Sequence, residues 1–173
     1  KEGEVYGDED LVNGVSGTYG PGMNIHRSAF GGRAAEYYSE DPLLSGMMAA
    51  NMVTGLQSRG IYVFAKHFAL NDQDTNRNGA CIWSNEQAMR EIYFVPFEKA
   101  VKEGGSTAVM SSYNNIGTTW AGASTALLTN VLRNEWGFIG TVITDNNEEH
   151  GFMDIKKAVL AGGTSLLFGW GTK

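Results

Sequence analysis

Short apolar segments alternate with helical patterns along most of this chain, and that alternation constrains the fold more than any other feature. β-Branched and aromatic residues concentrate in short runs at residues 61–68, 107–113, 141–145 and 164–168. A further run at 18–24 is weaker, because Pro21 removes a hydrogen-bond donor from any strand ladder. Apolar strands that alternate with helices predict an α/β fold with a parallel sheet and helices on its faces.

Helix-forming patterns fill the stretches between these runs. The first helix should begin with Asp41 as its N-cap and Pro42 as its first residue, and Gly60 should follow its end. A second is expected at 85–103, where Pro96 should kink or split it. Others are expected at 124–136 and 153–160. The apolar residues of the first helix recur at helical spacing: Leu43, Leu44, Met47, Met48, Met52 and Leu56.

Polar residues follow several of the predicted strands, at the edge where parallel α/β proteins place their sites. Both an open doubly wound sheet and a closed barrel fit this pattern. The chain has neither a GxGxxG nor a GxxxxGK[ST] motif, which favours the (β/α)8 TIM barrel. A complete barrel needs about 250 residues. We therefore expect a partial barrel domain at 18–173 that lacks its first strands, preceded by a separate segment at 1–17.

Asp145 ends a fully apolar run and is the leading candidate for a catalytic carboxylate. Glycoside hydrolysis requires two carboxyl groups, of which one can act as a nucleophile. The simpler alternative is that Asp145 only caps the next helix.

Lys66 and His67 are ionisable groups inside an apolar run, and burying such groups costs free energy unless they are paired or functional. They could bind sugar hydroxyls, or the lysine could pair with a buried acid and the histidine with the backbone.

The remaining candidates are weaker when each is judged alone. Arg33 and Arg77 follow strand-end loops but could be ordinary surface arginines. Met110 and Tyr113 could be core residues. His26 and His150 lack partners at metal-ligand spacing, so we expect neither a metal nor any other cofactor.

The overall composition excludes several classes of function. With 42% hydrophobic residues, 18% charged residues and a net charge of −6, the chain is typical of a globular domain and lacks a basic surface for nucleic acid. No apolar stretch is long enough to span a membrane. Cys81 is the only cysteine, and no serine lies in a GxSxG elbow. Residues 1–17 are acidic and do not resemble a signal peptide, which leaves the compartment open between cytoplasmic and secreted.

Several motifs occur in an order that resembles glycoside hydrolase family 3, in particular its bacterial β-glucosidases. The stretches that carry the resemblance are GPGMNIHRSAFGGR (20–33), EYYSEDPLLSG (36–46), AKHFALNDQDTNR (65–77), REIYFVPFEKAVKEG (90–104), AVMSSYN (108–114) and LLTNVLRNEWGFIGTVITD (127–145). The resemblance implies a TIM-barrel domain of a retaining β-glucosidase that removes terminal glucose by double displacement.

The resemblance also implies roles for individual residues. Asp145 matches the family's nucleophile, and Lys66 and His67 match the pair that binds hydroxyls of the first sugar. Arg33 and Arg77 match arginines of the same subsite. Met110 and Tyr113 match residues near the nucleophile. The acid/base residue is expected on a second α/β domain after the barrel, so none is assigned here.

The chain departs from the family pattern at several points. Asn146 stands where an aromatic residue usually follows the nucleophile, and Ala34 and Ala35 replace a polar and an aromatic residue. A β-xylosidase and a non-catalytic sugar-binding homologue remain alternatives. The β-N-acetylhexosaminidase branch is disfavoured, because ALNDQ rather than PGHG follows the KHF motif. The oligomeric state, including a homo-oligomer, stays open.

Overall fold

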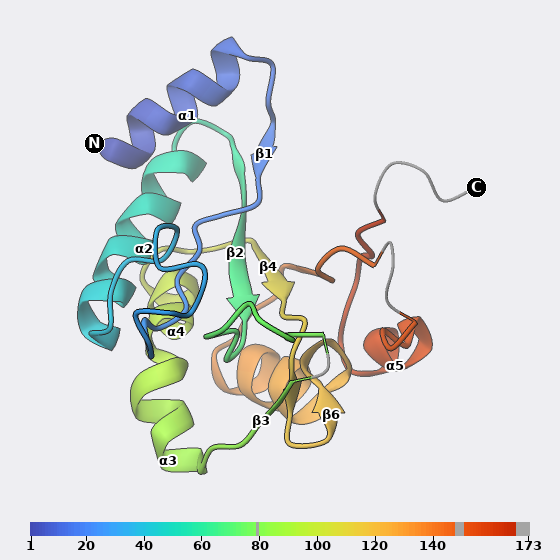
Figure 1. The fold of residues 1–173 in the computed structure, drawn as a ribbon. Coiled ribbons are helices and arrows are strands. Elements are labelled where there is room, and N and C mark those ends of the chain that lie inside the picture. The colour runs from blue at the N-terminus through green and yellow to red at the C-terminus, as the bar shows by residue number, and fades with distance from the viewer. Residues whose placement is uncertain (79, 148–150, 169–173) are drawn as a thin grey trace.

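The computed structural model describes residues 1–173 except 79, 148–150 and 169–173. Its main sheet is parallel throughout, with strand order β1-β2-β4-β7 (Figure 1). Helical segments connect each strand to the next, which confirms the expected α/β class. The strands are β1 (Gly17–Thr18), β2 (Tyr62–Phe68), β4 (Ala108–Ser111) and β7 (Thr141–Ile143).

Two of the expected strands, including the weaker one at 18–24, are shorter than the sequence suggested. The run at 18–24 contributes only the end of β1 and an isolated bridge from Gly22 to Lys66, because Pro21 interrupts the ladder. Residues 164–168 contribute one bridge, in which Ser165 pairs with Ile143. Both segments nevertheless run beside the sheet at its two edges.

Helix α2 (Pro42–Gln57) begins where local chemistry predicts. Asp41 accepts a hydrogen bond from the backbone NH of Leu44 at 2.8 Å, and Pro42 occupies the first turn. Gly60 has a φ of +81°, the left-handed conformation expected just after a helix. The caps, rather than the apolar pattern, therefore set the limits of this helix.

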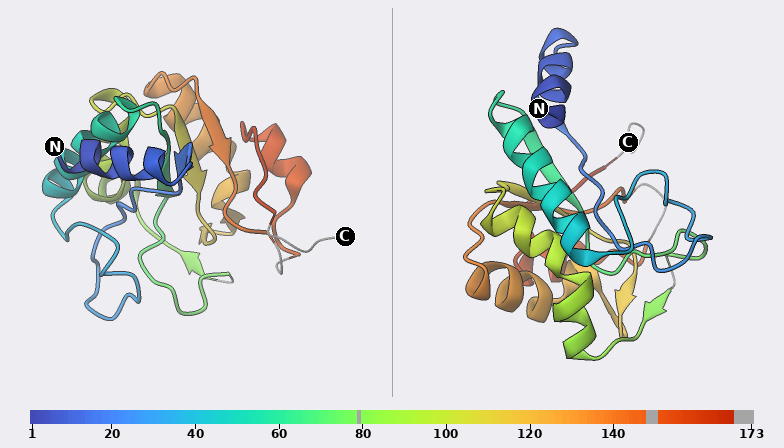
Figure 2. Two further views of the ribbon diagram at one scale, coloured as in Figure 1. Left: turned by 90° about the horizontal axis from the view of Figure 1, so that it is seen from above. Right: turned by 90° about the vertical axis from the view of Figure 1, so that its left-hand side faces the viewer.

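The buried face of α2 differs from the one that its large apolar residues indicate. Leu43, Leu44, Met47 and Met48 are all at least 39% exposed, whereas small residues of the helix are buried. Of the predicted apolar residues, Leu56 is fully buried, beside Val53. A Cβ added at Gly46 would lie 2.6 Å from the Lys99 side chain, and one at Gly55 would lie 2.8 Å from the backbone of Gly3. Close approach of α1 (Glu2–Val12) and α4 (Val95–Lys102), visible in Figure 2, selects the small face.

The expected helix at 85–103 is divided, as Pro96 predicts. It consists of α3 (Glu86–Ala88), a wide π-helical segment η1 (Met89–Tyr93) and α4. The break rotates the inward face of the helix, so that Phe94 and Phe97 are buried and Ile92 is 37% exposed.

The other helical segments are η2 (Ala121–Ala123), the π-helix η3 (Ala126–Glu135) and α5 (Ile155–Leu160). Within the described residues, no helix is long and apolar enough to cross a bilayer.

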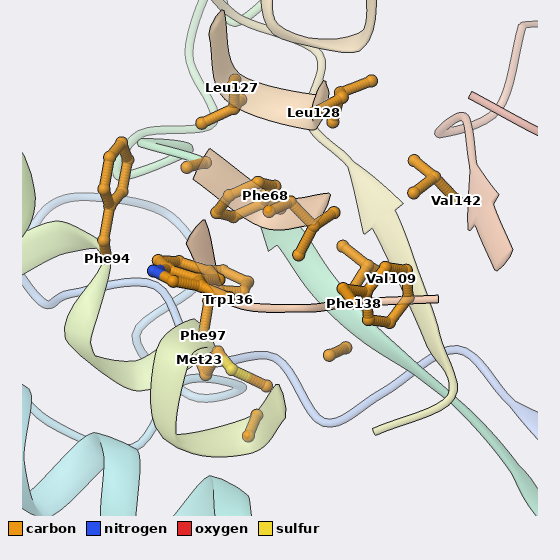
Figure 3. Close-up of a cluster of buried hydrophobic side chains, with 14 of the residues drawn as sticks. Met23, Phe68, Phe94, Phe97, Val109, Leu127, Leu128, Trp136, Phe138 and Val142 are labelled. Atoms are coloured by element: carbon orange, nitrogen blue, oxygen red, sulfur yellow. The ribbon is translucent and has the colours of Figure 1, made fainter. Parts of the chain in front are cut away.

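A cluster of aromatic rings fills the space between the sheet and its covering helices (Figure 3). Phe68, at the end of β2, is fully buried. Its ring centroid lies 5.2 Å from that of Phe97, 5.5 Å from that of Trp136 and 5.9 Å from that of Phe94. This packing fixes the carboxyl end of β2, where Lys66 and His67 lie.

A small second sheet with strand order β3-β5-β6 lies beyond the carboxyl ends of the main strands (Figure 1). Its members are β3 (Cys81–Ile82), β5 (Asn115–Ile116) and β6 (Thr119–Trp120). The inner face carries Ile82 and Ile116, which pack against the main core. The indole NH of Trp120 donates to the Ser112 carbonyl at 2.8 Å, which ties this sheet to the end of β4.

Candidate active site

Asp145 follows β7 at the carboxyl edge of the sheet and is 8% exposed. Its Oδ1 accepts a hydrogen bond from the backbone NH of Asn146 at 2.8 Å. Its Oδ2 lies 3.6 Å from Nε2 of His67 and has no hydrogen-bond partner within the described part of the chain. One carboxylate oxygen is therefore held by the backbone, and the other faces His67 at the end of β2, on the far side of the intervening strand β4.

Glu36 joins two of the predicted basic residues. Its Oε1 pairs with Nζ of Lys66 at 2.7 Å, and its Oε2 pairs with Nη2 of Arg33 at 2.7 Å. The two cations are largely buried, with side-chain exposures of 14% for Lys66 and 20% for Arg33. Burial raises the pKa of Glu36, but hydrogen bonds and charges from Lys66 and Arg33 outweigh it and hold that pKa below its ordinary value. Glu36 is therefore an ionised bridge between them.

His67 is almost fully buried and its ring is held by side chains rather than by the backbone. Nη1 of Arg33 lies 3.2 Å from its Nε2, and the Tyr37 hydroxyl lies 3.1 Å from its Nδ1. Because a guanidinium can only donate, Nε2 must accept and Nδ1 carries the proton. Burial, followed by the charges of Arg33, Lys66 and Arg77, lowers the pKa of His67 well below its usual value. The imidazole is therefore neutral at physiological pH.

Arg77 connects the loop after β2 to the segment after β4. Its Nη1 pairs with Oδ1 of Asp74 at 2.8 Å, and its guanidinium lies 4.3 Å from the ring centroid of Tyr113. The Tyr113 hydroxyl donates to the carbonyl of Asn146 at 2.6 Å. Arg77 and Tyr113 thus meet beside the backbone that carries Asp145.

The structure brings six of the seven predicted site residues into one group. Arg33 contacts His67, which approaches Asp145, and Arg77 lies over Tyr113. Met110 belongs to β4, where it is 2% exposed and pairs with Ile143 of β7. Its place in the strand accounts for its burial.

Opposing influences act on the pKa of Asp145. Burial raises it, whereas the hydrogen bond from Asn146 and the charges of Arg77, Arg33 and Lys66 lower it, and burial prevails. The three basic residues favour the ionised carboxylate. Their charges offset part of the free-energy cost of burying the Asp145 carboxylate, but not all of it.

Sequence reasoning missed several residues that hold this group together. Glu36, Tyr37 and Asn24 were not among the predicted site residues. Asn24 forms two hydrogen bonds with the backbone of His67, at 2.8 Å and 3.0 Å. A signal for Glu36 was present, because Lys66 in an apolar strand requires an acidic partner. Nothing in the sequence indicated which acid that partner would be.

The described residues contain no group of three or more His, Cys, Asp or Glu side chains placed to hold a metal ion. His26 instead bonds the carbonyl of Tyr37 through Nε2 at 3.0 Å. His150 lies outside the described residues.

The buried carboxyl group of Asp72, on the loop after β2, should make the stability of the fold depend on pH. Asp72 is 8% exposed, and within the described structure neither of its oxygens has a hydrogen-bond partner. Burial raises the pKa of Asp72 to about 7, and the charge of Arg27 offsets only part of that rise. The unfolded chain loses this proton near the ordinary value of 3.8, so wild-type stability should fall as the pH rises from there to about 7.

We expect Asp72→Asn to remove this loss, because asparagine stays neutral. Its gain in free energy of unfolding should be small at pH 4 and reach about 4 kcal/mol at pH 8. Denaturant unfolding across this pH range measures the difference. A gain that stays constant with pH would contradict a neutral buried Asp72.

The comparison with known proteins decides the family. The model of the glycosyl hydrolase family 3 N terminal domain matches residues 1–170. The chain belongs to glycosyl hydrolase family 3. Family 3 relatives include beta-glucosidase A of Butyrivibrio fibrisolvens, which is 48% identical over 82% of this chain and 17% of its own length. An exo-alpha-(1->6)-L-arabinopyranosidase of Bifidobacterium longum is 43% identical over 87% of this chain and 20% of its own length.

Solved family 3 structures show the same fold. Beta-glucosidase 3B from Thermotoga neapolitana in complex with glucose matches with a TM-score of 0.90 and 42% identity, over 95% of this chain and 22% of that one. The beta-glucosidase from Kluyveromyces marxianus in complex with glucose matches with a TM-score of 0.93 and 32% identity, over 99% and 20%. These matches confirm the expected partial barrel. The chain spans about a fifth of the length of these relatives.

Proposed function

We propose that this chain carries the nucleophile and the first sugar subsite of a retaining β-glucosidase. The observation that carries the proposal is the buried Asp145 carboxylate, whose Oδ2 lies 3.6 Å from His67 and is surrounded by basic side chains. A carboxylate that is anchored through one oxygen and has a second oxygen without a partner suits attack on an anomeric carbon.

In the proposed reaction, Asp145 Oδ2 forms a bond to the anomeric carbon as the bond to the leaving oxygen breaks. An acid on a second α/β domain protonates that oxygen. Water then attacks the same carbon, and the carboxylate leaves with its electron pair. The net result is hydrolysis with retention of configuration. The short span of the chain relative to its relatives agrees with an acid from another domain.

The basic residues have separate tasks in this scheme. Lys66 and Arg33, fixed by Glu36, donate hydrogen bonds to sugar hydroxyls. Neutral His67 keeps Nε2 as an acceptor and so adds no charge of its own beside Asp145. Arg77 favours the ionised form of Asp145 and is itself held by Asp74 and Tyr113.

A covalent trap tests the proposal directly. A 2-deoxy-2-fluoro-β-glucoside with a good leaving group should glycosylate the intact protein once. Fluorine slows both displacement steps, but the good leaving group restores the rate of the first step only, so the glycosyl-enzyme accumulates. Mass spectrometry of peptides should then place the label on Asp145. A label on another carboxylate, or continued turnover of the reagent without any label, would exclude this nucleophile.

The nature of the first sugar has a second candidate. The relative from Bifidobacterium longum is named for an α-L-arabinopyranosyl group rather than for glucose, at an identity close to that of the β-glucosidases. A panel of aryl β-glucoside, β-xyloside and α-L-arabinopyranoside substrates separates these specificities through their kcat/KM values. We expect the β-glucoside to have the highest value.

A further inference from the structure

An exposed aromatic ring lies on the outer face of the small sheet. We call this face, formed by Cys81, Trp83, Asn115 and Gly117, the outer β3-β5 face. Cys81 pairs with Asn115 in the parallel register of β3 and β5, and side chains two residues apart on a strand share a face. Trp83 is 73% exposed, whereas Ile82 between it and Cys81 packs inward.

The turn after β5 contacts the Trp83 indole at one edge. Gly117 lies beside the outer edge of the six-membered ring, where an added Cβ would be 3.7 Å from Cζ3 and 3.8 Å from Cη2. Gly117 also has a φ of +59°, which favours glycine at this turn. One edge of the indole therefore contacts the turn, and most of its surface remains available for contact with a ligand.

A hollow of about 760 Å³ lies between Arg77 of the candidate active site and Cys81, the member of the outer β3-β5 face that borders it; Trp83 follows two residues after Cys81. Arg77 and Asp74 line it on the active-site side, Cys81 and Ile82 line it on the sheet side, and Gln73 and Asn76 also contribute. Asp74 pairs with Arg77 at 2.8 Å and approaches Arg33 at 3.9 Å. The same side chains thus border both the proposed sugar subsite and the hollow.

The chemistry of this hollow matches a sugar ring. A pyranose presents C–H groups on its faces, which pack on an aromatic ring, and hydroxyls around its rim, which require hydrogen-bonding partners. Trp83, which lies two residues after Cys81 and directly follows the end of β3, offers the aromatic surface. The amide groups of Gln73 and Asn76 and the Asp74–Arg77 pair offer donors and acceptors. A protein partner would more often bury a wider apolar surface than one indole.

We propose that the hollow and the outer β3-β5 face bind the leaving-group sugar of the substrate, with Trp83 as its stacking platform. The proposal rests on the glycosidase function proposed above and extends it from the first sugar to the second. It makes Trp83 a determinant of leaving-group specificity, and it predicts a preference for disaccharides over glucosides with a small leaving group.

Kinetics of the intact protein test the role of Trp83. The measured quantity is kcat/KM for a β-linked glucose disaccharide divided by kcat/KM for methyl β-glucoside, since both substrates place glucose in the first subsite. Trp83→Ala should lower this ratio about tenfold, and Trp83→Phe should lower it less because it retains a ring. Ile139→Ala removes an apolar side chain that is 97% exposed at the opposite end of β7, and it should leave the ratio unchanged. An unchanged ratio in Trp83→Ala would overturn the proposal.

The exposed thiol of Cys81 reports occupancy of the hollow without any catalysis. In Asp145→Asn, the disaccharide should slow alkylation of Cys81 by iodoacetamide several-fold, and Trp83→Ala should abolish this protection. Protection that persists in Trp83→Ala would refute the role of Trp83 as the stacking platform. A thiol that never reacts in the intact protein would show that another part of the protein covers the outer β3-β5 face, and this would also overturn the proposal. Failure of wild-type protein to hydrolyse methyl β-glucoside would instead count against the glycosidase function, and the alkylation result would still stand.

Discussion

Replacing Asp145 by asparagine should lower kcat of the intact protein for an aryl β-glucoside by at least about a thousandfold. The amide has nearly the shape of the carboxylate, but its oxygen is a poor nucleophile and cannot form the glycosyl ester. The fold should survive, because the raised pKa of Asp145 indicates that its buried charge costs stability. Thermal unfolding should therefore give an equal or higher Tm alongside the lost turnover.

A second variant separates a nucleophile from a residue that only binds. Asp145→Gly leaves space beside His67, and added azide can enter and attack the anomeric carbon in place of the carboxylate. Turnover should recover partly, with α-glucosyl azide as the product, because a single displacement inverts the configuration. Asp145→Asn turnover within about tenfold of wild type, or a β-configured azide product, would exclude Asp145 as the nucleophile.

Replacing Glu36 by glutamine should lower kcat/KM on the order of a hundredfold, although Glu36 need not touch the reacting atoms. Glutamine keeps the length of the side chain but removes the charge that neutralises Lys66 and Arg33, both of which lie within 2.7 Å of it. Two neighbouring cations would then repel one another, and the hydrogen-bond donors to the sugar would move. Steady-state kinetics on β-glucosides measures the loss.

The control for Glu36 is Glu40→Gln, an exposed acid in the same loop, which should change kcat/KM less than twofold. A double-mutant cycle shows whether Glu36 acts through its partner. In a Lys66→Met background, Glu36→Gln should cost much less than it does alone, since the lysine that it positions is gone. Additive losses would mean that Glu36 has a separate role.

Local sequence signals were sufficient to predict the ends of those helices that carry capping or helix-breaking residues. Asp41, Pro42 and Gly60 marked the limits of α2, and Pro96 marked the break before α4. Their effects depend on the backbone within one helical turn, so no tertiary information was needed. The run at 164–168 had no such signal, and its partner strand could not be read from composition.

Contacts between distant segments limited what the sequence could predict. Which face of α2 is buried depends on how closely α1 and α4 approach it, and this selects Gly46 and Gly55 over the larger Leu43 and Met47. The pairing of Glu36 with Lys66 likewise joins residues that are far apart in the chain. By contrast, the strand-end positions of Lys66, His67 and Asp145 followed from the alternation of apolar runs.

The adjacency of Phe68 and His67 has a practical consequence for engineering. One peptide bond separates the ring at the centre of the aromatic cluster from the imidazole that approaches Asp145. A substitution that repacks the interior to resist heat would also shift the imidazole, and a substitution that retunes substrate preference at His67 would disturb the interior. Thermal tolerance and specificity at this strand end are therefore linked traits, and a directed-evolution campaign would have to select for both at once.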